Sequence, residues 1–237
     1  ARAGTKYQVH APAGQSVVDL VYQNSDGIGG TLRWKGDFGV NPLASTGRID
    51  VDGLQLTKLY QLLRQPAAPL TITDGTLGLR FSYDMAMVRD KGQTFPHLRL
   101  TQASVALDQV ATTLKPGTQL TLQHLETALP RIEAHLQSKA LVNVQPFDVH
   151  ARDLKLQLDD KLQFGMDRID VSTITPDLQA MRIDVAAVTL GGGELGAAGR
   201  DGPRAKLSQV SLTDTSAHLK AHRVAARTLT LSGLQTD

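Results

Sequence analysis

Histidines and carboxylates are the residues of this chain that could do metal or acid–base chemistry. His218 and His222 are four residues apart, a spacing that places both side chains on one face of a strand or helix and could begin a metal site. No nearby carboxylate completes a ligand motif, so two solvated histidines explain the spacing better. The chain has no cysteine, which excludes disulfides and thiolate metal sites. The sequence therefore predicts no metal centre and no cofactor.

Paired carboxylates and glycine clusters indicate turns rather than catalysis. Asp159-Asp160 precedes Lys161 between two strand-like runs, as expected of a polar turn. Gly191-Gly192-Gly193-Glu194 lacks the Lys-Ser/Thr pair and the following helix of a phosphate-binding loop, so we expect a tight turn or loop there. Gly27-Ile28-Gly29-Gly30 does not match the dinucleotide pattern, and no Gly-x-Ser-x-Gly elbow occurs. We therefore expect that this chain is not an enzyme.

A short repeat identifies the elements that dominate the chain. Arg-Ile-Asp-Val occurs at Arg48–Val51, Arg168–Val171 and Arg182–Val185. Each copy alternates polar and apolar side chains, which is typical of a half-buried β-strand. Leu54 and Leu56 follow the first copy, and Val188 and Leu190 follow the third, giving the pattern apolar-x-apolar-x-x-apolar-x-apolar.

The spacing within this pattern predicts bent strands. Strand side chains have a period of two, so the extra spacer would turn the second apolar pair to the opposite face. A bulge or corner at the spacer would return that pair to the first face. A chain that repeats this device would build long, bent strands around one concave apolar surface.

One segment has a helical period instead. Leu56, Leu59, Tyr60 and Leu63 are spaced i, i+3, i+4 and i+7, which predicts a helix near residues 56–65 with one apolar face. This face would cap the groove or the edge of the sheet. Residues 104–114 fit either a helix or a strand, and their strand-rich surroundings favour a strand.

The predicted fold class is mainly β. We expect an extended, twisted, mostly antiparallel sheet that forms an open groove or a partly closed barrel, with one or two short helices. Residues 1–92 would form a first β segment that contains the helix, and residues 93–237 a β-rich continuation of the sheet. A single domain covering both segments is the alternative.

Composition and charge narrow the choice of ligand. Aromatic residues make up only 4% of the chain, so little aromatic bulk is present to fill an apolar interior, and this suits a surface that leaves room for acyl chains. Each buried methylene of such a chain contributes about 0.8 kcal/mol. The net charge of +2 gives no electrostatic reason to expect nucleic acid. A closed sandwich core with no cavity is the alternative. The candidate groove-lining residues are Leu77, Leu79, Phe81, Leu154, Leu156 and Leu158.

Residues 29–77 carry a set of motifs that resembles a known family. The motifs are Gly29-Gly30-Thr31-Leu32, Gly36-Asp37-Phe38, Asn41-Pro42-Leu43, Gly47-Arg48-Ile49, Gly53-Leu54-Gln55-Leu56, Leu59-Tyr60 and Gly75-Thr76-Leu77. As a set they resemble a stretch of the AsmA-like envelope proteins of Gram-negative bacteria, in a branch designated only as a domain of unknown function. The C-terminal part of the chain is similar in style.

The resemblance implies a function without catalysis. The family is similar in plan to bridge-like lipid-transfer proteins, which implies an apolar β-groove that holds the tails of phospholipids or other acyl-chain lipids during transport or outer-membrane homeostasis. It also implies a periplasmic location, envelope proteins as further partners, and an inner-membrane anchor outside this fragment. The rival hypothesis is a structural or adhesive envelope module that binds partner chains through its sheet edges.

Overall fold

The computed structural model of the chain describes most of its residues. The described ranges are 6–10, 17–23, 27, 29–40, 43–63, 70–90, 92–115, 117–136, 140–158, 161–197 and 204–236. Within them the chain forms fourteen strands and one helix. The strands are β1 (Lys6–His10), β2 (Val17–Gln23), β3 (Thr31–Val40), β4 (Leu43–Gln55), β5 (Thr71–Asp90), β6 (Gln93–Lys115), β7 (Thr118–Leu136), β8 (Ala140–Val144), β9 (Phe147–Leu158), β10 (Leu162–Asp177), β11 (Arg182–Ala197), β12 (Arg204–His218), β13 (Arg223–Ala225) and β14 (Thr228–Thr236), and the helix is α1 (Leu56–Leu63).

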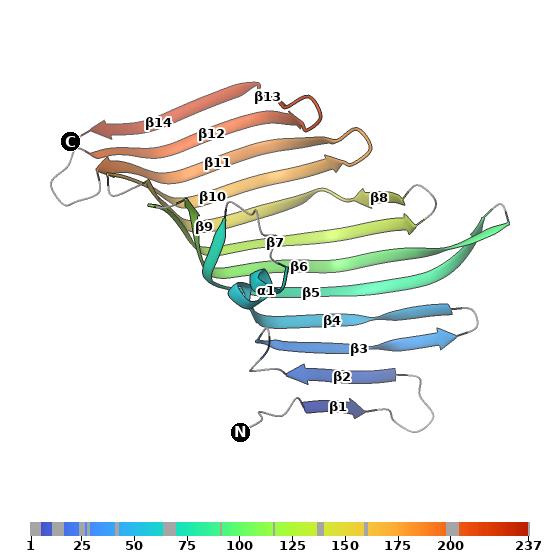
Figure 1. Ribbon diagram of the computed structural model, residues 1–237. Helices are drawn as coiled ribbons and strands as arrows, with labels where there is room; N and C mark the ends of the chain where they lie inside the picture. The colour runs from blue at the N-terminus through green and yellow to red at the C-terminus, as the bar shows by residue number, and fades with distance from the viewer. Residues whose placement is uncertain are drawn as a thin grey trace. The chain divides into compact units, whose positions relative to one another are not determined.

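The strands form a single sheet in which most sequence neighbours pair. Its order is β1-β2-β3-β4-β5-β6-β7-β9-β10-β11-β12-β13, with β8 on β7 and β14 on β12 (Figure 1). Consecutive strands run antiparallel, as short connections between them require. In the described part of the chain the sheet is not closed, because its first and last strands do not pair. The predicted fold class is therefore confirmed: mainly β, antiparallel and open, with one short helix.

The chain divides into two compact units that are interleaved along the sequence. Unit 1 comprises Ala1–Gln55, Leu77–Val105 and Ala128–Pro146, and unit 2 comprises Leu56–Thr76, Ala106–Thr127 and Phe147–Asp237. Strands β5, β6 and β7 each contribute residues to both units. The domain boundary predicted between residues 92 and 93 falls at the turn between β5 and β6, inside unit 1, and stays a prediction.

In unit 1, strands β3 and β4 show how the alternating sequence produces two faces. Trp34 lies directly opposite Ile49, and Leu32 lies opposite Val51, so these apolar side chains share one face. The Trp34 Nε1–H donates to the Tyr83 hydroxyl of β5 at 2.7 Å, which places Tyr83 on that face too. The Arg48 and Asp50 side chains lie on the other face.

In unit 2, helix α1 begins at Leu56 and ends at Leu63, where its apolar period predicted a helix. Leu56 is buried, and its Cδ1 lies close to Gly75. Gly75 has a φ of +128°, and a Cβ there would approach Leu56 Cδ1 to 2.9 Å, so glycine permits the helix to lie this close. Gly75 belongs to β5, so the helix packs against this strand of the sheet.

Residues 104–114 lie within β6, which confirms the strand interpretation. No helix in the described ranges has the length and apolar character needed to cross a membrane.

Candidate functional site

Strands β9, β10, β11, β12 and β14 of unit 2 lie side by side (Figure 1). Their registers align apolar residues in rows that cross the strands. Residues directly opposite each other in an antiparallel pair share a face, so each row lies on one side of the sheet. The rows are Val149–Val171–Val188–Leu212–Leu229, Ala151–Ile169–Leu190–Val210–Leu231, Leu154–Met166–Gly193–Leu207–Leu234, Leu156–Phe164–Leu195–Ala205–Thr236 and Leu158–Leu162–Ala197. We call these residues the apolar rows.

Two spacer residues separate the second row from the third in every one of these strands. In β9 the spacers are Arg152 and Asp153, and Asp153 has a left-handed φ of 52°. The same arrangement recurs in other strands of the chain. Where two spacer residues interrupt the apolar alternation of a strand and one of them is left-handed, the left-handed residue is the second spacer. These residues are Gly53, Gln102, Gln109, Asp153, Thr173, Gly192, Asp214 and Gly233. The predicted corner is therefore present, and it consists of one left-handed residue.

The corners keep the spacers on the polar side of unit 2. At one bend, the spacers Asp153, Asp167 and Gly192 line a hollow of about 200 Å³ together with Lys155 and Glu194 of the polar face. The hollow is also lined by three members of the apolar rows, Leu154, Met166 and Ala197.

A second bend has the same arrangement. Thr173, Ala186 and Asp214 share a hollow of about 330 Å³ with the polar-face residues Thr175 and Asp184. Ala186 and Ala187 are the spacers that follow the third Arg-Ile-Asp-Val copy. Neither is left-handed, and the left-handed residues at this level belong to the flanking strands.

The prediction of a tight turn or loop at the glycine triplet is wrong. Gly191, Gly192 and Gly193 lie inside β11, and their backbone pairs with β10 and β12 on either side of the bend. Gly192 has a φ of +67°, and a Cβ there would collide with the carboxylate of Asp167. The triplet therefore forms a corner in a continuous strand instead of ending one.

The apolar rows are covered only in part. Ala151 and Met166 are the two buried apolar residues of β9–β14, with exposed fractions of 4% and 5%. Most other row residues are half-buried, whereas Leu195 is 43% exposed. No side chain in the described ranges is less than 2% exposed. Because a large exposed apolar patch usually marks a binding surface, the apolar rows are the candidate site.

The repeated Arg-Ile-Asp-Val segments have a second role that our sequence reasoning missed. In each copy the arginine forms an ion pair with the aspartate two residues later, at 3.0 Å for Arg48–Asp50, 2.8 Å for Arg168–Asp170 and 2.7 Å for Arg182–Asp184. The two-residue spacing of arginine and aspartate could have predicted these ion pairs, because residues i and i+2 of a strand lie on the same face. The copies therefore support the polar face while their Ile and Val lie on the apolar one.

Histidine–carboxylate pairs link strands on the polar side of unit 2. His150 Nδ1 lies 2.8 Å from Asp170 Oδ1, and His124 Nδ1 lies 2.6 Å from Asp108 Oδ1. The hydrogen bond to Asp108, with a further contribution from Glu126, raises the pKa of His124 above its ordinary value of 6.5. The protonated imidazole therefore stabilises the β6–β7 pairing.

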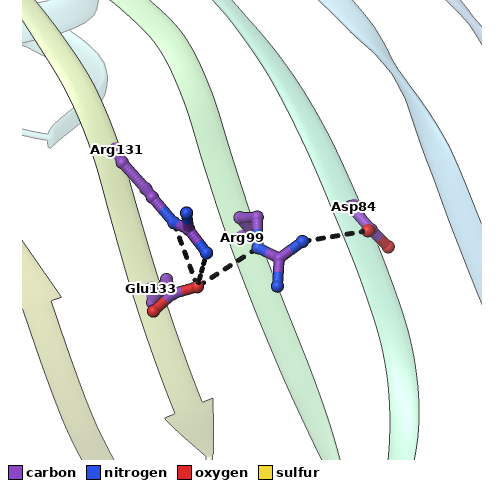
Figure 2. Close-up of polar contacts among 4 residues, drawn as sticks. All are labelled: Asp84, Arg99, Arg131 and Glu133. Atoms are coloured by element: carbon purple, nitrogen blue, oxygen red, sulfur yellow. Dashed lines mark hydrogen bonds and ion pairs between the residues drawn. The ribbon is translucent and has the colours of Figure 1, made fainter.

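Unit 1 has a corresponding polar network across β5, β6 and β7 (Figure 2). Arg99 bridges Asp84 and Glu133, with N–O distances of 3.9 and 3.2 Å, and Arg131 contacts Glu133 at 2.5 Å. The hydrogen bond from Arg131 is the main reason that the pKa of Glu133 is lowered. These charges mark the polar face of this unit.

The candidate groove residues fall into different units. Leu77, Leu79 and Phe81 are half-buried in unit 1 and alternate with Arg80, which reaches Asp50 at 3.8 Å on the polar face. They share the side of β5 that carries Tyr83. Leu154, Leu156 and Leu158 belong to the apolar rows of unit 2.

The remaining sequence candidates lie apart from the apolar rows. Leu59 and Tyr60 of α1 are half-buried, and the Tyr60 hydroxyl donates to the Leu70 carbonyl. The Leu63 side chain and the pair Asp159-Asp160 lie outside the described residues. His218 ends β12 and His222 occupies the following turn, and both are exposed.

Comparisons of the chain with protein-family models, curated proteins and solved structures found no match. The geometry of the apolar rows is therefore the main basis for a functional proposal.

Proposed function

We propose that this protein binds the acyl chains of phospholipids or related lipids along its apolar rows and has no catalytic role. The observation that carries the proposal is the continuity of these rows. Four of the rows cross five strands of unit 2 and the fifth crosses three, in each case without a charged side chain.

The chemistry of the rows suits flexible hydrocarbon. Leu, Val, Ile and Ala dominate them, Phe164 is their one aromatic residue, and no hydrogen-bonding side chain interrupts them before Thr236. Neighbouring strands lie about 4.8 Å apart, so a row across five strands is roughly 19 Å long. A chain of methylenes lying along it would gain about 0.8 kcal/mol for each methylene buried, without any directional contact.

The family resemblance places this activity in a cellular setting. The motifs of residues 29–77 support an AsmA-like protein that acts in the periplasm, in phospholipid transport or outer-membrane homeostasis. An inner-membrane anchor in the full-length protein and envelope proteins as partners belong to the same proposal.

A pair of variants tests the proposal. Replacing Leu195 with Glu places a charge in the middle of the apolar rows at a residue that is already 43% exposed, so the fold should survive. Binding of a fluorescent fatty-acid probe should fall roughly tenfold or more, because the charge would have to lose its water beside the acyl chain. Gln163→Glu adds the same charge to the polar face and should leave binding unchanged.

Three results would contradict the proposal. The first is wild-type protein that does not bind the probe. The second is a Leu195→Glu variant that binds as well as wild type. The third is a Leu195→Glu variant that unfolds, as expected if Leu195 belonged to a closed core. Circular dichroism of each variant separates loss of folding from loss of binding.

The rival structural or adhesive role has one observation in its favour. Strand β14 presents an exposed sheet edge that another chain could extend.

A further inference from the structure

The hollow at the second bend of unit 2 has a lining rich in hydroxyl groups. It lies on β10, β11 and β12, which are neighbours in the sheet (Figure 1). Its volume of about 330 Å³ falls within the roughly 300–1,000 Å³ that is usual for small-molecule sites. Four of its eight lining residues carry a hydroxyl group, namely Thr173, Thr175, Thr215 and Ser216.

The hollow is open because the strand in its middle has a small side chain there. Thr173 of β10 and Asp214 of β12 are left-handed corners, with φ of 53° and 48°. The residue of β11 that lines the hollow at this level is Ala186, whose side chain is an exposed methyl group. A longer side chain at Ala186 would occupy the space.

The hydroxyl groups of the lining are free to bind a ligand. Within the described ranges, none of the four has a hydrogen-bond partner in the protein. The Thr215 oxygen is in addition buried, and a buried hydroxyl without a partner costs free energy. Rotation about the single χ1 torsion of Thr215 can turn this hydroxyl toward a ligand, which would remove that cost.

The charges at the hollow favour a neutral ligand. Its two carboxylates already have cationic partners, because Asp184 lies 2.7 Å from Arg182 and Asp214 lies 3.2 Å from Arg227. The residues that line the hollow in the described part of the chain include no Lys, Arg or His, so an anion would meet two carboxylates and no positive side chain. A neutral molecule with many hydrogen-bonding groups meets no such penalty.

A saccharide has the matching chemistry. Each sugar hydroxyl both donates and accepts, so it can donate to the oxygens of Asp184 and Asp214 and exchange hydrogen bonds with the threonine and serine hydroxyls. The C–H face of a pyranose ring can lie on the apolar side chains of Val185 and Ala186, which also line the hollow.

We infer that this hollow is a binding site for a neutral saccharide, in which the Thr215 hydroxyl gains a partner on binding. The inference goes beyond acyl-chain binding and does not depend on it, because no residue that lines this hollow belongs to the apolar rows.

Saturation-transfer difference NMR of the 237-residue chain with glucose, galactose, mannose and N-acetylglucosamine tests the inference. At least one of these sugars should bind saturably. Thr215→Val keeps the shape of the side chain and should weaken that binding roughly two- to tenfold, as expected for one neutral hydrogen bond. The same variant should raise the melting temperature of the sugar-free protein, because it removes the unpaired buried hydroxyl.

Two further variants locate the site. Ala186→Gln should abolish sugar binding by filling the hollow, and it should leave binding of the fatty-acid probe unchanged. Thr189→Val removes a hydroxyl group of β11 outside the hollow and should keep the wild-type affinity for sugar.

Four results would overturn the inference. They are wild-type protein that binds none of the four sugars, sugar binding that persists in Ala186→Gln, a melting temperature that falls in Thr215→Val, and glucuronate that binds as tightly as glucose. Because the fatty-acid probe is measured on the same variants, failure of this inference and failure of the acyl-chain proposal are distinguishable.

Discussion

Each Arg-Ile-Asp-Val copy contributes side chains to both faces of the sheet. In each Arg-Ile-Asp-Val copy, the arginine and aspartate form an ion pair on one face, and the isoleucine and valine lie on the other. Such exposed pairs contribute little to the free energy of folding, because solvent screens them. These ion pairs act locally, because they give each strand of this single-layered sheet a well-defined polar face.

His124 gives this polar side a dependence on pH. Its pKa is raised by the hydrogen bond to Asp108, so its stabilising effect is fully present below pH 6.5 and is lost as the pH rises through the raised pKa. The free energy of unfolding should therefore fall as the pH rises from 6.5 through the raised pKa of His124. Chemical denaturation across this range measures the effect.

Two variants separate His124 from the other histidines. His124→Gln should remove this part of the pH dependence. His218→Gln, which replaces an exposed histidine at the end of β12, should retain it. An unchanged pH profile in His124→Gln would show that the Asp108 pair does not stabilise the fold.

At the scale of the strand, the left-handed corner is the central element. Where glycine occupies it, as at Gly53, Gly192 and Gly233, the conformation has no steric cost. Thr173 is different because it is β-branched and has a φ of 53°. Its N–H donates to Asp148 Oδ1 at 2.7 Å, which helps to hold this conformation.

Thr173→Gly should therefore stabilise the protein. Relief of the left-handed strain, about 1–2 kcal/mol, should exceed the added backbone entropy of glycine, about 0.5–1 kcal/mol. We expect the free energy of unfolding to rise by up to about 1 kcal/mol, measured by equilibrium denaturation. Thr175→Gly, two residues further along the same strand, should lower it by about 0.5–1 kcal/mol. Equal destabilisation by both variants would mean that β10 has no left-handed corner.

The strand pattern could be predicted because it depends on local spacing. The slipped apolar pairs predicted a corner, and the 3.6-residue period of Leu56, Leu59 and Tyr60 predicted α1. The glycine triplet at residues 191–193 misled us, because consecutive glycines are a strong local turn signal. Pairing with β10 and β12 on both sides overrides that signal and keeps β11 continuous.

The candidate site could be predicted only in part. Alternation identified Leu154, Leu156 and Leu158 as one face, but their partners in the apolar rows depend on cross-strand register, which the sequence does not specify. The two units are equally hard to foresee. Strands β5, β6 and β7 are long enough to contribute to both, so no single cut in the sequence separates the units.

At the scale of the whole chain, the described residues form a sheet, and few of them are buried. Six apolar residues in the described ranges are buried, and the apolar rows of unit 2 have no second sheet layer within that unit. A sheet normally buries its apolar face against another element. The proposed acyl chains would supply this cover in unit 2.

Native mass spectrometry of gently purified protein tests the central claim most directly. The account predicts masses above that of the 25.5 kDa chain, separated by the masses of bound acyl-chain lipids, which disappear after delipidation and return on incubation with phospholipid vesicles. Protein that stays at the mass of the chain, both before and after such incubation, would contradict it.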